Sequence, residues 1–183
     1  MLRLYNSMGE KKEDFIPLDP NSIKIYSCGI TVYDRMHLGH ARTYIFVDLL
    51  VRILKKLYKN VAYARNITDI DDKIIRRSAE RGVSIRELTD GVIQLCDEDF
   101  EYLQILKPTF EPRATETMKE IIEIIQMLID KGCAYESNNH VLFSVKKYGD
   151  YGKLSHKNYA EMELAAAGEL GGYKRNPLDF VLW

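Results

Sequence analysis

The chain has 183 residues, of which 46% are hydrophobic and 29% are charged, and its net charge is −1. This composition excludes a disordered chain, and the length allows one hydrophobic core with room for a small insertion. The balanced charge excludes an overall basic footprint for nucleic acid, so RNA contacts would have to come from local clusters. No apolar run approaches the roughly 18 residues that a membrane span needs, and the first residues lack a signal-peptide pattern. We therefore expect no membrane contact.

The first predicted elements alternate strand, helix and strand. Residues 1–20 contain a short alternating segment and two prolines, which indicate a hairpin or an edge strand. Residues 23–28 read as a buried strand, residues 41–58 as a helix and residues 61–65 as a second, parallel strand. The helix is apolar over most of its circumference, so we expect it to be covered on more than one side. Together these elements predict an α/β fold and the first half of a Rossmann-type domain.

The rest of the chain is predominantly helical before it becomes irregular. A helix is predicted from about Asp71 to Arg81, and the capping box Ser84–Glu87 begins another that extends to about Leu103. The later expectations are a helix over 115–131, a hairpin around 137–139, a loop over 148–172 and a strand over 179–183 that returns to the parallel sheet.

Two histidines, His37 and His40, stand at the turn between the first strand and the long helix. In α/β sheets such a turn lies at the carboxyl ends of the strands, where ligands bind and where the helix N-terminus attracts anions. Two imidazoles there could stabilise charge on an α-phosphate during adenylyl transfer, while Gly39 would let a purine or phosphate approach the backbone. The alternative is that the two histidines only cap the helix.

The acidic loop and the cysteines also allow alternatives. Three aspartates, Asp69, Asp71 and Asp72, could hold Mg²⁺, but their position before a helix favours a capping role. Three widely spaced cysteines argue against a disulfide framework and indicate a reducing compartment, so we expect a cytoplasmic protein. By its position alone Cys28 is either a buried structural residue or one ligand of a zinc site, which needs about four.

Longer motifs carry a family resemblance. The segments CGITVYDRMHLGHART (28–43), NITDIDDK (66–73), EPRAT (111–115) and RNPLDFVLW (175–183) resemble the N-terminal half of bacterial-type cysteinyl-tRNA synthetases. His37–His40 corresponds to the HIGH signature of class I synthetases, with Leu in place of Ile. The resemblance covers essentially the whole chain but not the second half of the family's enzyme. It implies residues 1–113 as the first half of the catalytic domain, 114–176 as a connective α+β insertion and 177–183 as the start of a return strand.

The resemblance implies a cysteine–tRNA ligase, which activates cysteine with ATP and Mg²⁺ to cysteinyl-adenylate and transfers it to tRNA-Cys. His37 and His40 would stabilise the α-phosphate, and Cys28 would be the first ligand of a zinc ion that binds the substrate thiol as thiolate. The further binding residues would be Gly29, Thr31, Gly39 and Thr68, with Thr68 lining the amino-acid pocket. The remaining zinc ligands and the KMSKS loop would lie in the missing half, so we expect the fragment to be inactive alone. KLSHK at 153–157 is interpreted as a chance likeness to that loop.

Two other functions fit the same residues. One is the related ligase that joins cysteine to an amino sugar in mycothiol assembly, and the other is a free-standing, non-catalytic nucleotide-binding fragment. Basic clusters at 76–86 and 146–157 could contact RNA, although solvated surfaces have the same composition. We expect weak tRNA binding by this chain, a monomeric intact enzyme, and self-association of the isolated fragment.

Overall fold

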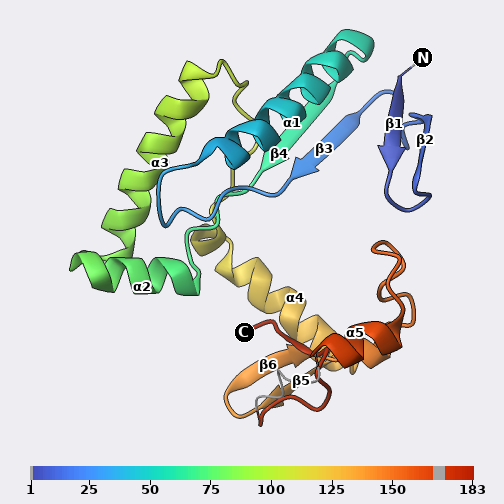
Figure 1. The fold of residues 1–183 in the computed structure, drawn as a ribbon, viewed down its shortest axis with the longest axis vertical. Coiled ribbons are helices and arrows are strands. Elements are labelled where there is room, and N and C mark those ends of the chain that lie inside the picture. The colour runs from blue at the N-terminus through green and yellow to red at the C-terminus, as the bar shows by residue number, and fades with distance from the viewer. Residues whose placement is uncertain (1, 167–171) are drawn as a thin grey trace. The chain divides into compact units, whose positions relative to one another are not determined.

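The computed structural model describes residues 2–166 and 172–183, which form two compact units (Figure 1). The parallel-sheet unit is Pro17–Met118, and the split unit joins Met1–Ile16 to Lys119–Trp183. Within the described ranges, no helix has both the length and the apolar character to cross a membrane.

The parallel-sheet unit is built on β3 (Ile23–Ser27), α1 (Leu38–Leu57) and β4 (Val61–Arg65). The two strands pair in parallel, with Ile23 opposite Val61, and α1 lies alongside them (Figure 1). Parallel neighbours need a crossover connection, which α1 provides. The predicted strand–helix–strand unit and the α/β fold class are therefore confirmed.

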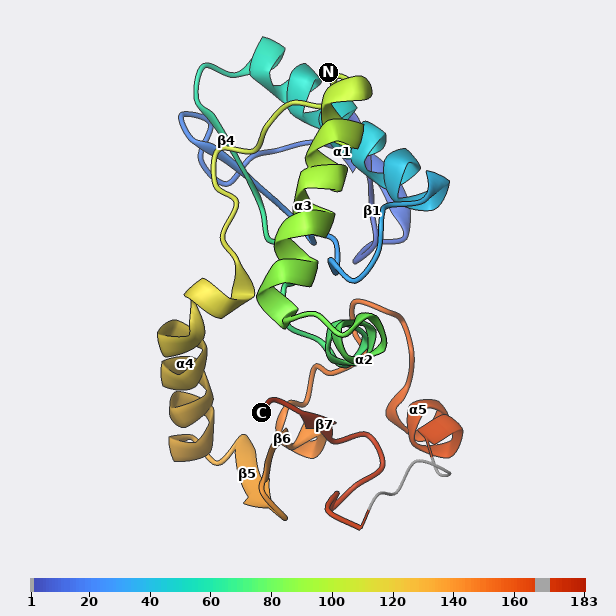
Figure 2. The ribbon, with the colours of Figure 1, turned by 90° about the vertical axis from the view of Figure 1, so that its left-hand side faces the viewer.

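Two further helices complete the core of this unit. Asp71 caps α2 (Asp72–Arg81), and Ser84 caps α3 (Ile85–Tyr102) by accepting a hydrogen bond from the Glu87 amide at 3.1 Å. Both predicted helix starts are confirmed. The core contains buried side chains from all three helices, among them Tyr44, Ile74, Leu88, Val92 and Phe100. Figure 2 shows α3 lengthwise and α2 end-on.

The expectation that α1 is covered on more than one side is wrong for the described chain. Its buried residues form one stripe, comprising Ala41, Tyr44, Val51 and Leu54. The other apolar side chains are exposed, with Phe46 at 63% and Leu49 at 53%, together with Ile45, Ile53 and Leu57. An apolar pattern shows that a face can be buried but not whether an element is present to cover it. The structure describes no element of the parallel-sheet unit over this face.

The split unit contains two antiparallel sheets. β1 (Arg3–Asn6) and β2 (Lys11–Asp14) form the predicted N-terminal hairpin. After α4 (Met118–Asp130), β5 (Ala134–Ser137) and β6 (His140–Phe143) form the second predicted hairpin. Its turn residues Asn138 and Asn139 have φ of +49° and +62°, the left-handed backbone that a two-residue hairpin turn requires.

Two expectations for the last part of the chain are wrong. The segment over 179–183 does not return to the parallel sheet, because β7 (Phe180–Val181) pairs with β6, where the Phe180 and Phe143 rings stack at 5.2 Å. The expected loop over 148–172 contains α5 (Tyr159–Ala166), although residues 167–171 lie outside the described ranges. Asn158 begins this helix by accepting a hydrogen bond from the Glu161 amide at 2.8 Å.

The buried carboxylate of Asp179 ties β7 to the rest of its sheet. Asp179 is 1% exposed and accepts hydrogen bonds from the Tyr135 hydroxyl at 2.6 Å and from the Val145 and Asn176 amides at 3.1 Å each. The donors come from β5, from η2 (Val145–Lys147) and from the turn before β7. One side chain therefore explains why the last strand joins this sheet.

Asp179→Ala should destabilise the split unit by about 3 kcal/mol or more, because three buried donors would lose their acceptor. Urea denaturation followed by circular dichroism measures the change. Asp150→Ala is the matched control, since that carboxylate is 64% exposed and forms an exposed ion pair with Lys153 at 3.8 Å, so its effect should stay within about 0.5 kcal/mol. Equal effects of the two variants would contradict the role of Asp179.

The isolated chain should self-associate through the exposed apolar face of α1, and Phe46→Glu should reduce the association by placing a charge in that face. Light scattering as a function of concentration measures both. Lys55→Glu introduces the same side chain at an exposed charged position of α1, with a net charge change of −2 in place of −1, and should leave association unchanged. A monomeric wild-type chain at all concentrations would show that this face does not drive association.

Candidate active site

Both histidines of the turn cap the N-terminus of α1. The Nδ1 atom of His37 accepts from the Gly39 amide at 3.1 Å, and the Nδ1 atom of His40 accepts from the His37 amide at 3.3 Å. This is a capping box in which both side chains are imidazoles, and the two rings stack with centroids 3.8 Å apart. The capping role that the sequence allowed is therefore confirmed.

Capping also fixes the tautomer of both rings. An Nδ1 atom that accepts a hydrogen bond carries no proton, so the proton of the neutral ring lies on Nε2. Burial lowers the pKa of His40, and the neighbouring His37 lowers it further. His37 is exposed and His40 is partly exposed, and no other residue of the described ranges hydrogen-bonds either Nε2 atom. Two N–H donors thus remain free at the helix N-terminus, so capping and anion binding are compatible.

Gly39 lies against the imidazole of the cap. A Cβ atom at this position would lie 2.9 Å from Cε1 and 3.0 Å from Nδ1 of His37. A larger residue 39 would therefore push the His37 ring out of its capping position. From the sequence we explained this glycine by the approach of a ligand, and the structure adds a second reason, which is the space taken by the His37 ring.

The turn after β3 makes the closest backbone approach in the site. A Cβ atom on Gly29 would lie 1.4 Å from the backbone oxygen of Asn66, so only glycine fits. The side chain of Asn66 also accepts a hydrogen bond from the Gly29 amide at 2.9 Å. Asn66 is a residue whose part in the site the sequence did not reveal, although it begins one of the family-like segments.

The two predicted threonines lie next to this approach. Thr31 and Thr68 form a parallel bridge that continues the pairing of β3 and β4, and the Thr68 amide donates to the Ile30 oxygen at 3.1 Å. Burial raises the pKa of Tyr44 to about 12, so its hydroxyl stays protonated. This hydroxyl donates to the backbone oxygen of Cys28 at 3.5 Å. Tyr44 belongs to α1, so the helix, Cys28 and the strand ends meet at one edge of the sheet.

The acidic loop serves the fold. Asp69 is 2% exposed and accepts from the amide and the hydroxyl of Thr115, at 3.0 and 2.6 Å. It thereby anchors η1 (Ala114–Glu116), a role that the sequence did not suggest. Asp71 caps α2 as predicted, through the Lys73 amide at 2.8 Å, and Asp72 lies in the first turn of that helix. The described residues hold no group of three or more side chains that could bind a metal ion.

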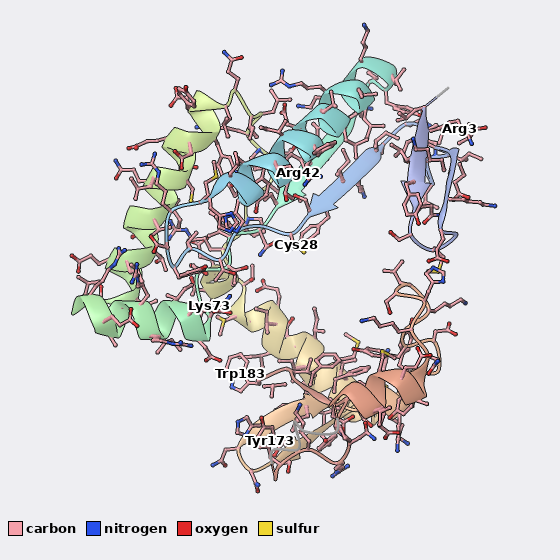
Figure 3. The ribbon with its side chains drawn as sticks, viewed as in Figure 1. Arg3, Cys28, Arg42, Lys73, Tyr173 and Trp183 are labelled. Carbon is pink, nitrogen blue, oxygen red and sulfur yellow. The ribbon has the colours of Figure 1, made fainter. Side chains whose placement is uncertain are left out.

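Cys28 is exposed, so its interpretation as a buried structural residue is wrong (Figure 3). Its free thiol follows β3 directly and is accessible to a ligand. A zinc site needs about four ligands, however, and within the described ranges Cys28 belongs to no group of three or more potential metal ligands. The residues that the structure describes therefore do not form a complete zinc site by themselves.

A buried arginine, also missed by the sequence, secures the end of β4. Arg65 is 4% exposed, donates from Nε to Glu111 at 3.0 Å, and stacks over the Phe100 ring at 4.0 Å. Its amide donates to the Phe110 oxygen at 3.0 Å, and the segment from 110 to 113 runs parallel to the continuation of β4. Residues 110–113, most of which belong to the EPRAT segment, thus lie beside β4 like a third strand, although they form only isolated bridges. They fix the position of the residues that follow β4.

Comparison with known proteins agrees with this geometry. The family model described as "tRNA synthetases class I (C) catalytic domain" matches residues 14–183. The cysteine–tRNA ligases of Methylocella silvestris and Legionella pneumophila (strain Philadelphia 1) are both 52% identical over the whole chain, and that of Beijerinckia indica is 50% identical. The chain spans 41% of the first relative and 40% of the other two.

Among solved structures, a LeuRS of Agrobacterium radiobacter K84 in a ternary complex with tRNA and LeuAMS superimposes with a TM-score of 0.54. The match covers 73% of this chain and 18% of the LeuRS at 18% identity, so it supports the fold alone. The resemblance to cysteinyl-tRNA synthetases is confirmed by the relatives and the family model together. The match over residues 14–183 shows that the chain belongs to the family of class I (C) tRNA synthetase catalytic domains.

Proposed function

We propose that this chain is the N-terminal part of a cysteine–tRNA ligase, which activates cysteine with ATP to cysteinyl-adenylate and then esterifies tRNA-Cys. Relatives that are 52% identical to this chain are cysteine–tRNA ligases, which supports the substrate. The observation that carries the chemistry is the stacked pair His37 and His40, whose Nε2–H groups are free at the N-terminus of α1.

These donors suit the transition state of adenylyl transfer. Negative charge develops on the oxygens of the α-phosphate, and donors that are already oriented stabilise it without reorganisation. The N-terminal dipole of α1 favours the same charge. The capping bonds hold both rings in place, so His37 and His40 would act by hydrogen bonding and not by proton transfer.

The neighbouring residues would bind the amino acid and the nucleotide. Gly29 and Thr31 line the edge at which the turn meets the strand ends, and the Thr68 hydroxyl would face the amino acid. We propose Cys28 as one zinc ligand, with the others supplied by the part of the relatives that this chain does not span. The donor type is suitable, because zinc favours thiolate sulfur.

The remaining assignments follow from the same proposal. Residues 1–113 would be the first half of the catalytic domain and 114–176 the connective insertion. All three cysteines are unpaired, which suits a reducing cytoplasm. ATP would enter with Mg²⁺ as a substrate complex, and this chain alone is expected to be inactive.

His40→Ala in the full-length protein should lower cysteine-dependent exchange of pyrophosphate into ATP by more than about tenfold, because a donor to the α-phosphate is lost. The same variant loses a helix cap, which costs about 1 kcal/mol of stability. His40→Asn separates the two effects, since its Oδ1 takes the place of Nδ1 in the cap but nothing replaces Nε2. It should be as inactive as His40→Ala and nearly as stable as the wild type. Unchanged exchange in either variant would exclude the catalytic role.

The cap should weaken as the pH falls below about 6.5. The pKa of His40 is lower in the folded chain than in the unfolded one, so the unfolded state binds more protons in that window and stability rises with pH. The stabilisation is complete above about pH 6.5 and is lost as the pH falls towards the folded pKa. Thermal unfolding between pH 7.5 and 5.5 measures it, and His40→Asn should show a smaller decrease in Tm. Identical decreases would show that His40 is not the titrating group.

A further inference from the structure

Asn66 connects the turn that carries Cys28 to the strand end that carries Thr68. Its Oδ1 atom accepts from the Gly29 amide at 2.9 Å and from the Tyr26 hydroxyl at 2.8 Å. Its Nδ2 atom donates to Oγ1 of Thr68 at 3.1 Å. One half-buried amide therefore contacts both sides of the sheet edge where the amino acid would bind.

The orientation of this amide follows from its neighbours. A backbone N–H can only donate, so the atom that faces Gly29 must be the oxygen of Asn66. The nitrogen must then face Thr68, whose Oγ1 can only accept from it. Because Oγ1 accepts at this contact, the proton of the Thr68 hydroxyl remains free, and within the described ranges that hydroxyl makes no other hydrogen bond.

The position of the amide is fixed as firmly as its orientation. The backbones of Gly29 and Asn66 lie in contact, and the bridge between Thr31 and Thr68 continues on the far side. The backbone of Asn66 therefore cannot shift without breaking the pairing of the strand ends, and its side chain cannot turn without losing the hydrogen bonds to Gly29 and Thr68. Because the Asn66 amide donates at this point, the Thr68 hydroxyl does not donate its proton to Asn66.

We propose that Asn66 is a positioning residue that keeps the Thr68 hydroxyl available as a donor to an acceptor atom of the bound amino acid. This inference rests on the proposed function. The amino acid offers acceptors in its carboxylate and in the acyl oxygen of its adenylate, whereas its ammonium group offers only donors. An aspartate at position 66 would reverse the direction of this hydrogen bond. A carboxylate can only accept, so the Thr68 hydroxyl would donate to it and would no longer be free to donate to the amino acid.

The test is steady-state, cysteine-dependent ATP–pyrophosphate exchange by the full-length protein. Asn66→Asp keeps the size of the side chain and the acceptor for Gly29, but it should raise the KM for cysteine about tenfold or more while the KM for ATP stays within about twofold. Thr68→Val should raise the KM for cysteine similarly, and Thr68→Ser should stay within about threefold of the wild type. Asn60→Asp, at the opposite end of β4, is the matched control and should match the wild type.

The double variant Asn66→Asp/Thr68→Val decides between positioning and simple structural support. If Asn66 acts through the Thr68 proton, adding Asn66→Asp to Thr68→Val should change the KM for cysteine by less than about twofold. An undiminished effect in the Thr68→Val background, or a wild-type KM in Asn66→Asp, would overturn the inference. If Asn66→Asp does not fold, equal KM values for Thr68→Ser and Thr68→Val would overturn it. Absence of exchange in the wild-type protein would instead refute the proposed function on which the inference rests.

Discussion

The contact of Gly29 with Asn66 is the constraint on which the candidate site depends. A Cβ atom would come within 1.4 Å of the opposite backbone oxygen, so the turn after β3 and the segment after β4 can meet only because residue 29 is glycine. This contact extends the parallel pairing beyond the regular strands to Thr31 and Thr68. It also places Cys28 at the surface, at the edge of the sheet where α/β folds bind their ligands.

The helix that starts at this edge shows how one residue type can serve fold and chemistry together. An imidazole has two nitrogen atoms, and in His37 and His40 one nitrogen completes the helix cap while the other remains free. Serine or aspartate would cap equally well but would leave no neutral N–H donor beyond the cap. The observed cap and the proposed catalytic role of these histidines are therefore compatible.

The elements that could be predicted from the sequence are those that depend on residues close together along the chain. The strand–helix–strand unit follows from periodicity, and the starts of α2 and α3 follow from the short-range caps at Asp71 and Ser84. Two of the errors concern contacts between distant residues. Nothing near Asp179 indicates that its carboxylate meets Tyr135 and Val145 and so holds β7 on the antiparallel sheet. In the same way, the apolar pattern of α1 could not show which of its faces the described chain leaves uncovered.

The residues of the candidate site also differ in whether a local sequence signal indicates them. The histidines and glycines stand out because they are close in sequence at a strand-to-helix turn. Asn66 and Arg65 were missed because their partners are Gly29 and Glu111, far away along the chain. The most direct measurement is amino-acid-dependent ATP–pyrophosphate exchange by the full-length wild-type protein, with cysteine compared with serine. Exchange with cysteine should exceed exchange with serine by at least about 100-fold. No exchange with cysteine, or equal exchange with both amino acids, would contradict the proposed function.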